Sequence, residues 1–184
     1  MEAIGGALQQ YGRIDVVFNN AGVMYSGAFH ELDDDLWDRV LDVNLRGTYL
    51  FCRMAIPYML GQGGGSIINM SSVMATLTEP GYEAYTTSKA GIIGLTKAIA
   101  VSYADRGIRC NCVCPGWVDT PLNRRLAEEL GGMDRLNVLI KQQQPNGRML
   151  STREVANAVL FLASDEASGV TGAVLYSVPE AWEL

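Results

Sequence analysis

The chain has 184 residues, 48% of them hydrophobic and 18% charged, which suits one folded domain over residues 1–184 and excludes a disordered protein. Its net charge is −6 without a lysine/arginine cluster, so no nucleic-acid partner is expected. Apolar runs end well before 18 residues and the N-terminus lacks a signal-peptide pattern, so we expect no membrane span and a cytoplasmic location.

Strand-like and helix-like segments alternate along the chain, which is typical of an α/β protein with a parallel sheet. Acidic residues at 33–35 favour a helix start, and we expect Pro57 to end that helix. Pro179 cannot donate to a sheet, so the last strand should stop by Val178. In chain order we predict helix 2–11, strand 14–19, helix 33–57, strand 66–71, helix 82–105, strand 108–114, helix 122–130, a polar stretch to 147, helix 152–163 and strand 171–176.

The glycine-rich segment at residues 61–66 has the composition of a phosphate-binding loop but not its context. A dinucleotide-binding loop follows a strand and opens a helix, so that backbone N–H groups face the phosphates. This segment follows a predicted helix and opens a strand. We therefore interpret it as a flexible connection.

Cysteine spacing argues against a metal site. Cys110, Cys112 and Cys114 alternate along one predicted strand, so they share a face. Neighbours on that face lie roughly 6.5–7 Å apart, whereas two thiolates on one zinc ion must lie within about 4 Å. We predict no metal ligands and interpret these cysteines as small buried apolar residues. The single histidine, His30, is interpreted as a surface or capping residue.

Tyr85 and Lys89 carry the clearest chemical signal. Four residues apart on a helix, they share one face, and an ammonium beside a phenol should lower the tyrosine pKa from about 10. Tyr85 is then a candidate acid/base for a carbonyl/alcohol pair. Ser71 and Ser72 end a predicted strand, where a hydroxyl could bind a substrate carbonyl or simply close a turn. Asn44, inside a predicted helix, could be a tolerated surface residue.

Five motifs occur in a fixed order: Asn19-Asn20-Ala21-Gly22, Val43-Asn44, Ser71-Ser72, Tyr85-x-x-x-Lys89 and Pro115-Gly116. Together they closely resemble the short-chain dehydrogenase/reductase family over roughly residues 2–175. The resemblance implies a three-layer Rossmann-like parallel sheet. It also implies an oxidoreductase that transfers hydride between NAD or NADP and a small-molecule ketone or secondary alcohol.

The resemblance also implies roles for residues at matching positions. Tyr85 would be the acid/base, and Lys89 would lower its pKa and bind the nicotinamide ribose. Ser72 would hold the substrate oxygen, and Asn44 would help to hold a relay water behind Lys89. Residues 117–150 would form a mobile substrate lid. The residues expected around the cofactor are Asn19, Asn20, Ala21, Gly22, Tyr85, Lys89, Pro115, Gly116, Val118 and Thr120.

The N-terminal end departs from the family pattern, because the usual first strand and glycine-rich turn are not found. We expect roughly 60–75 residues to be missing, leaving about four strands. The strand at 14–19 would then be an edge prone to association, and NAD or NADP would bind weakly. The helices over 33–57 and 82–105 match those of the family's dimer interface, so a homo-oligomer is expected.

Two other interpretations remain open. The chain could be a catalytically silent relative that binds or assembles with a longer partner, which co-purification would favour. It could also be a non-functional fragment, or the product of a wrongly assigned start. An in-frame glycine-rich segment in the DNA upstream of Met1 would distinguish that case from an enzyme.

Overall fold

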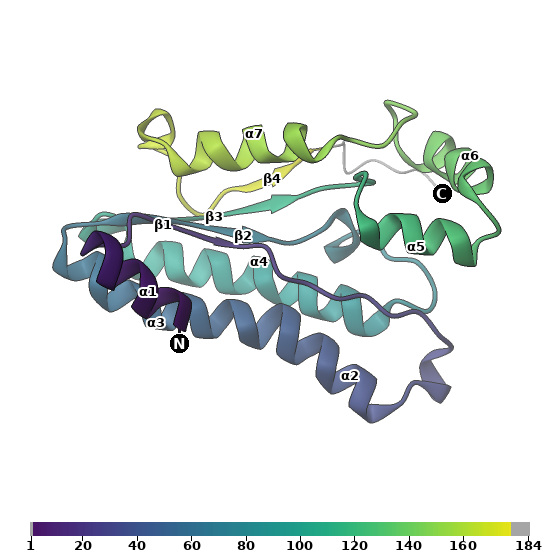
Figure 1. The fold of residues 1–184 in the computed structure, drawn as a ribbon, viewed down its shortest axis with the longest axis horizontal. Helices are drawn as coiled ribbons and strands as arrows, with labels where there is room; N and C mark the ends of the chain where they lie inside the picture. Colours follow the sequence, from purple (N-terminus) through teal and green to yellow (C-terminus); the bar gives the residue numbers. More distant parts are fainter. Residues whose placement is uncertain (1, 178–184) are drawn as a thin grey trace.

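The computed structural model describes residues 2–177, and these form one four-stranded parallel sheet between helices (Figure 1). Helices α3 and α4 cover one face and α7 covers the other, which gives three layers. The predicted three-layer α/β architecture with a parallel sheet of four strands is therefore confirmed. The strands, in their spatial order, are β1 (Val16–Asn19), β2 (Gly65–Met70), β3 (Ile108–Cys114) and β4 (Val174–Tyr176). The helices are α1 (Glu2–Tyr11), α2 (Asp34–Leu41), α3 (Gly47–Gly61), α4 (Glu83–Tyr103), α5 (Pro121–Glu129), α6 (Met133–Gln143) and α7 (Thr152–Ala163).

Alternate residues of the central strands supply the two cores. Ile67 of β2 and Cys110 of β3 pack with α3 and α4, whereas Ile68 and Val113 pack with α7. The strands are buried on both faces, which explains their nearly continuous apolar sequence. All four cysteines are free and buried, as expected for small apolar residues.

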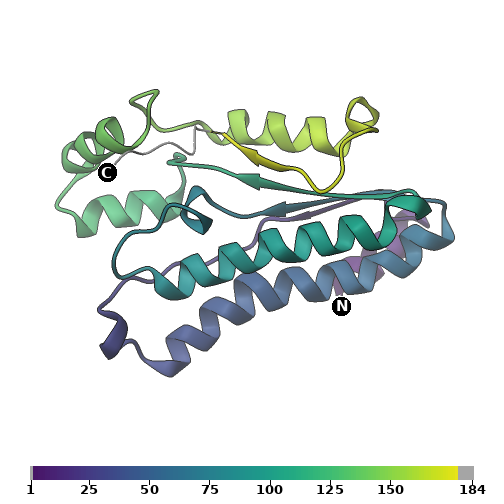
Figure 2. The same cartoon turned by 180° about the vertical axis from the view of Figure 1, so that it is seen from behind.

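The last crossover has the opposite hand from the one before it. The β2–α4–β3 and β3–α7–β4 units both step in the same direction across the sheet, but their helices lie on opposite faces (Figures 1 and 2). Nearly all such crossovers in proteins are right-handed, so one of this pair is an exception. As a result, residues 115–151 pass over the carboxyl ends of the strands before α7 begins.

The helix predicted over 33–57 differs in two ways. It contains a π-helical turn at Asp42–Arg46 between α2 and α3, and it continues through Pro57 to Gly61. Pro57 cannot donate to the carbonyl of Arg53, but both residues lie on the exposed side, where water can reach that carbonyl. The expectation that Pro57 ends the helix was wrong for this reason.

The stretch after Gly132 was described only as polar, with no helix predicted, but it contains helix α6. Leu136 and Ile140 lie one turn apart on its buried face and pack against Ala127 of α5. Two buried residues in eleven make a weak periodic signal, which is why the sequence pattern did not predict this helix.

The ends of the sheet agree with the prediction where they are described. Within residues 2–177, β1 pairs only with β2, and its Val16 and Phe18 side chains are 44% and 42% exposed. Association through this edge stays a prediction. Strand β4 ends at Tyr176, and Val178 and Pro179 lie outside the described residues. No helix in the described part of the chain is both long and apolar enough to cross a bilayer.

The glycine-rich connection is a tight turn that brings two backbones together. Gly64 has φ +146°, and a Cβ atom there would collide with the carbonyl oxygen of Gly107. Gly65 N–H donates to that same oxygen at 3.2 Å, which joins the starts of β2 and β3. A side chain at position 64 would therefore strain the sheet where the two strands begin.

We expect Gly64→Ala to lower the free energy of unfolding by about 2–4 kcal/mol, because the backbones would have to separate. Urea unfolding measures the change. Gly61→Ala is the matched control, since a Cβ atom there has no neighbour within 4 Å. The control should change stability by less than about 1 kcal/mol. Equal losses in both variants would contradict the proposed backbone collision.

Candidate active site

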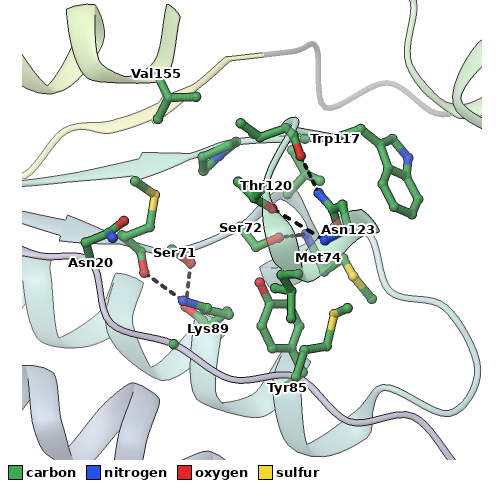
Figure 3. A pocket seen from close by; sticks show the side chains of 18 of the residues that line it. Asn20, Ser71, Ser72, Met74, Tyr85, Lys89, Trp117, Thr120, Asn123 and Val155 are labelled. Atoms are coloured by element: carbon green, nitrogen blue, oxygen red, sulfur yellow. Dashed lines mark hydrogen bonds between the residues drawn. The ribbon is translucent and has the colours of Figure 1, made fainter. Parts of the chain in front are cut away.

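The carboxyl ends of β1, β2 and β3 open into one cavity of about 480 Å³ (Figure 3). Ligands of open parallel sheets bind at this edge, and α4 and α5 also contribute to the walls. Much of the lining is apolar, with a few hydroxyl and charged groups among it. The residues predicted from sequence that line this cavity are Asn20, Gly22, Ser71, Ser72, Tyr85, Lys89, Pro115, Gly116, Val118 and Thr120.

Two hydroxyl groups meet inside the cavity. The Tyr85 hydroxyl, on α4, lies beside the side chain of Ser72, which follows β2 (Figure 3). Ser72 Oγ also accepts from the N–H of Met74 at 3.1 Å, which fixes its position at the start of a short 3-10 turn. A carbonyl oxygen could thus be held by both hydroxyls at once.

Lys89 lies one helical turn from Tyr85 and is almost completely buried, at 3% exposure. Its Nζ donates to the carbonyl oxygen of Met70 at 2.9 Å and lies 5.5 Å from the centre of the Tyr85 ring. Ser71 Oγ in turn donates to the backbone carbonyl of Lys89 at 2.8 Å. Burial lowers the pKa of Lys89 to about 8, although the nearby thiols of Cys112 and Cys114 act in the opposite direction.

The pKa of Tyr85 shifts in the direction opposite to the prediction. Burial raises it, the neighbouring Ser72 side chain lowers it, and the thiol of Cys114 raises it further. Lys89 was expected to lower this pKa, but its ammonium points to the Met70 carbonyl instead. Tyr85 therefore keeps its proton at neutral pH in the protein on its own.

The local pattern around Asn44 suggested a tolerated surface residue. In the structure Asn44 is instead fully buried in the π-helical turn. Its Oδ1 accepts from the N–H of Val23 at 2.8 Å. Its Nδ2 donates to the carbonyl of Val23 at 2.9 Å and to Ser88 Oγ at 3.0 Å. Asn44 therefore fixes the segment after β1 against α4, close to Lys89.

Gly22 lies beside Lys89 and Asn44. A Cβ atom at this position would lie 3.4 Å from Lys89 Nζ and 3.4 Å from Asn44 Oδ1. A methyl group there would therefore contact both polar atoms without a clash.

Asn19 and Ala21 do not line the main cavity. They line a separate cavity of about 320 Å³ along β1 and α3. The Asn19 amide donates to Asn69 Oδ1 at 2.8 Å and to Cys52 Sγ at 3.3 Å, so it joins β1 to β2 and α3. In this position Asn19 holds the sheet against α3 and does not contact the main cavity.

Residues 117–150, expected to be a substrate lid, cover the outer part of the cavity with α5 and Trp117. Trp117 Nε1 donates to Gln143 Oε1 at 3.1 Å, and Gln143 Nε2 donates to Glu79 Oε1 in the loop before α4. The sequence prediction missed several lining residues because they lie in loops or on helices without any motif. They are Met24, Met74, Glu79, Tyr82, Asn123, Thr152 and Val155.

The known proteins that this chain resembles include reductases and dehydrogenases. A family model described as Enoyl-(Acyl carrier protein) reductase matches residues 1–177. The chain is 42% identical to 2-(R)-hydroxypropyl-CoM dehydrogenase of Xanthobacter autotrophicus over 94% of its own length and 69% of that protein. It is 43% identical to 3-oxoacyl-[acyl-carrier-protein] reductase FabG of Thermotoga maritima, over 95% and 68% respectively.

A solved structure shares the fold. The chain superposes on ligand-free aldohexose dehydrogenase of Thermoplasma acidophilum with a TM-score of 0.90 and 42% identity. The match covers 95% of this chain and 70% of that one.

The buried Lys89 makes a prediction about stability and pH. Its pKa is about 8 in the folded protein against an ordinary 10.5, so between these values the unfolded chain binds more protons. The free energy of unfolding of the wild type, relative to Lys89→Met, should therefore rise by up to about 3 kcal/mol between pH 7.5 and 10.5. Urea unfolding across this range measures the difference. A flat difference would mean that the ammonium is hydrated in the folded protein.

Proposed function

This chain belongs to the short-chain dehydrogenase/reductase family of oxidoreductases, and we propose that it interconverts a ketone and a secondary alcohol with NAD or NADP. The observation that carries the proposal is the meeting of the Tyr85 and Ser72 hydroxyls in one cavity, with Lys89 one turn along α4 (Figure 3). In this proposal Tyr85 is the catalytic acid/base.

A nicotinamide cofactor, when bound, supplies the hydride for reduction or accepts it for oxidation. Ser72 Oγ would hold the substrate oxygen while Tyr85 Oη donates its proton to that oxygen. Because the pKa of Tyr85 is raised from its ordinary value, the phenol is protonated at neutral pH, as a proton donor must be before reduction. The Lys89 ammonium would stabilise the phenolate that remains, from its position 5.5 Å from the ring centre.

The residues after β3 fit the nicotinamide end of such a cofactor. Among the hydrogen bonds of residues 2–177, the N–H of Val118 donates to no acceptor, while its carbonyl accepts from Asn123 Nδ2 at 2.7 Å. That N–H and the Thr120 hydroxyl would bind the carboxamide, with Gly22 and Asn20 on the opposite wall. Weak overall cofactor binding stays a prediction, as does movement of residues 117–150 as a lid.

We place the relay water proposed for Asn44 in a gap that would lie between Gly22, Lys89 and Asn44. A water there would lie between Lys89 Nζ and Asn44 Oδ1, the two polar atoms nearest to a Cβ atom built at residue 22. It could return a proton to Lys89 and Tyr85 after each reduction. Asn44 Oδ1 already accepts one hydrogen bond, and a carbonyl oxygen can accept a second.

A second candidate function rests on the exposed apolar surface of α3 and α4. Tyr49, Phe51 and Tyr58 of α3 are 40–47% exposed, and Val101 of α4 is 86% exposed. Exposed apolar side chains of this kind favour association through these two helices, as proposed for a homo-oligomer. It would equally serve a catalytically silent chain that assembles with a longer partner.

We expect Tyr85→Phe to lower kcat by about 10²–10⁴-fold while leaving the fold intact, because the ring stays and only the donated proton is lost. Turnover of a small ketone, followed by the absorbance of the reduced cofactor, measures the loss. The control is Tyr103→Phe, at the other end of the same helix. An unchanged rate in Tyr85→Phe would refute the acid/base assignment, and an inactive wild type would favour the assembly candidate.

Gly22→Ala tests the relay water. A methyl group 3.4 Å from Lys89 Nζ and Asn44 Oδ1 fits without a clash but fills the gap, so kcat should fall by about tenfold or more. Thermal unfolding should stay within a few degrees of the wild type. Gly27→Ala, where a Cβ atom meets nothing within 4 Å, should leave both properties unchanged. If Gly22→Ala retains full activity, the gap holds no water that the reaction needs.

A further inference from the structure

The charges around the cavity are unevenly placed. Lys89 and Glu79 are the only charged side chains among the described residues that line it. Lys89 lies at the floor, beside Tyr85 and the end of β2. Glu79 comes from the loop before α4 and reaches Gln143 of α6, so it stands on the side of the cavity that residues 117–150 cover.

Lys89 is not available to neutralise an anionic group on a substrate. It is 3% exposed, donates to the Met70 carbonyl and faces the Tyr85 ring. Two arginines of residues 117–150 are also engaged elsewhere. Arg124 pairs with Asp119 at 2.8 Å and Arg148 pairs with Glu154 at 2.7 Å, and these four residues lie outside the lining of this cavity.

Glu79 has no cationic partner among residues 2–177, since it forms none of the ion pairs found there. Its Oε1 accepts from the neutral amide of Gln143, which holds the carboxylate in place without compensating its charge. Glu79 and Glu129 also contribute to the raised pKa of Tyr82, after burial as the main cause, which indicates a negative potential on this wall.

The remaining outer wall offers apolar contacts. These come from the segment after β1, the loop after β2 and the residues that cover the cavity. They are Met24, Met74, Trp117, Leu122 and Leu126.

We propose that Glu79 is a specificity-determining residue that restricts the reaction to uncharged, largely apolar ketones and secondary alcohols and excludes substrates that carry a carboxylate, sulfonate or phosphate group. The proposal rests on the proposed function, because it concerns the substrate of that reaction. An anionic substrate would lose water in this cavity, meet no free cation and approach a like charge. Selectivity here comes from repulsion as much as from attraction.

The test compares acetoacetate with its methyl ester, which carries the same ketone but no charge. In the wild type, kcat/KM should favour the ester by at least about tenfold. Glu79→Gln keeps the oxygen that accepts from Gln143 but removes the charge, so the ratio should fall about fivefold, mainly through a lower KM for acetoacetate. The control is Glu166→Gln, which makes the same charge change beyond the far end of α7 and should leave the ratio unchanged.

Binding provides a second readout that needs no turnover. Trp117 lines the cavity, so quenching of its fluorescence, identified by its loss in Trp117→Phe, reports binding of either compound. The specificity proposal is supported if the wild type binds the ester more tightly than acetoacetate and Glu79→Gln loses this preference. If this result is found but neither compound is reduced, only the proposed function fails. Preference for acetoacetate, an unchanged ratio in Glu79→Gln or no binding of either compound overturns the specificity proposal.

Discussion

One buried contact sets the geometry of the candidate site: the ammonium of Lys89 on the last carbonyl of β2, that of Met70. A cation removed from water needs a fixed partner, and this one joins the middle layer of the fold to α4. The hydroxyl of Ser71 bonds the Lys89 carbonyl and so fixes the same junction from the strand side. With α4 held in this register, Tyr85 falls one turn away, beside Ser72.

The π-helical turn at Asp42–Arg46 fixes the position of the segment that follows β1. A regular helix would have no reason to bury an asparagine, but the extra residue of the turn leaves Asn44 inside the protein, where three hydrogen bonds satisfy its amide. Two of these bonds hold Val23, just beyond the end of β1. Local irregularity in one helix thus determines where the backbone of another segment lies, close to the proposed proton donor and its lysine.

The sequence allowed prediction of what depends on local pattern and burial. The strand at Ile108–Cys114 and the helix at Thr152–Ala163 both have the predicted bounds. Failures arose where tertiary surroundings outweigh local preference. Pro57 is tolerated because its helix face is hydrated, and α6 depends on only two buried residues. The pKa of Tyr85 depends on its desolvation, and no spacing rule reveals that. Glu79 belongs to no motif, so only the assembled walls of the cavity show its importance.

Because the last crossover has the opposite hand, the groups proposed to react and much of the ligand-contacting surface come from different segments of the chain. Because α7 returns on the opposite face, the long connection from β3 spans the mouth of the cavity without contributing a strand to the sheet. The groups proposed to move protons come from β2 and α4, which are fixed by the sheet, whereas much of the surface that a ligand would touch comes from that connection. Evolution could therefore exchange the connection to suit a new compound and leave the reacting groups where they are.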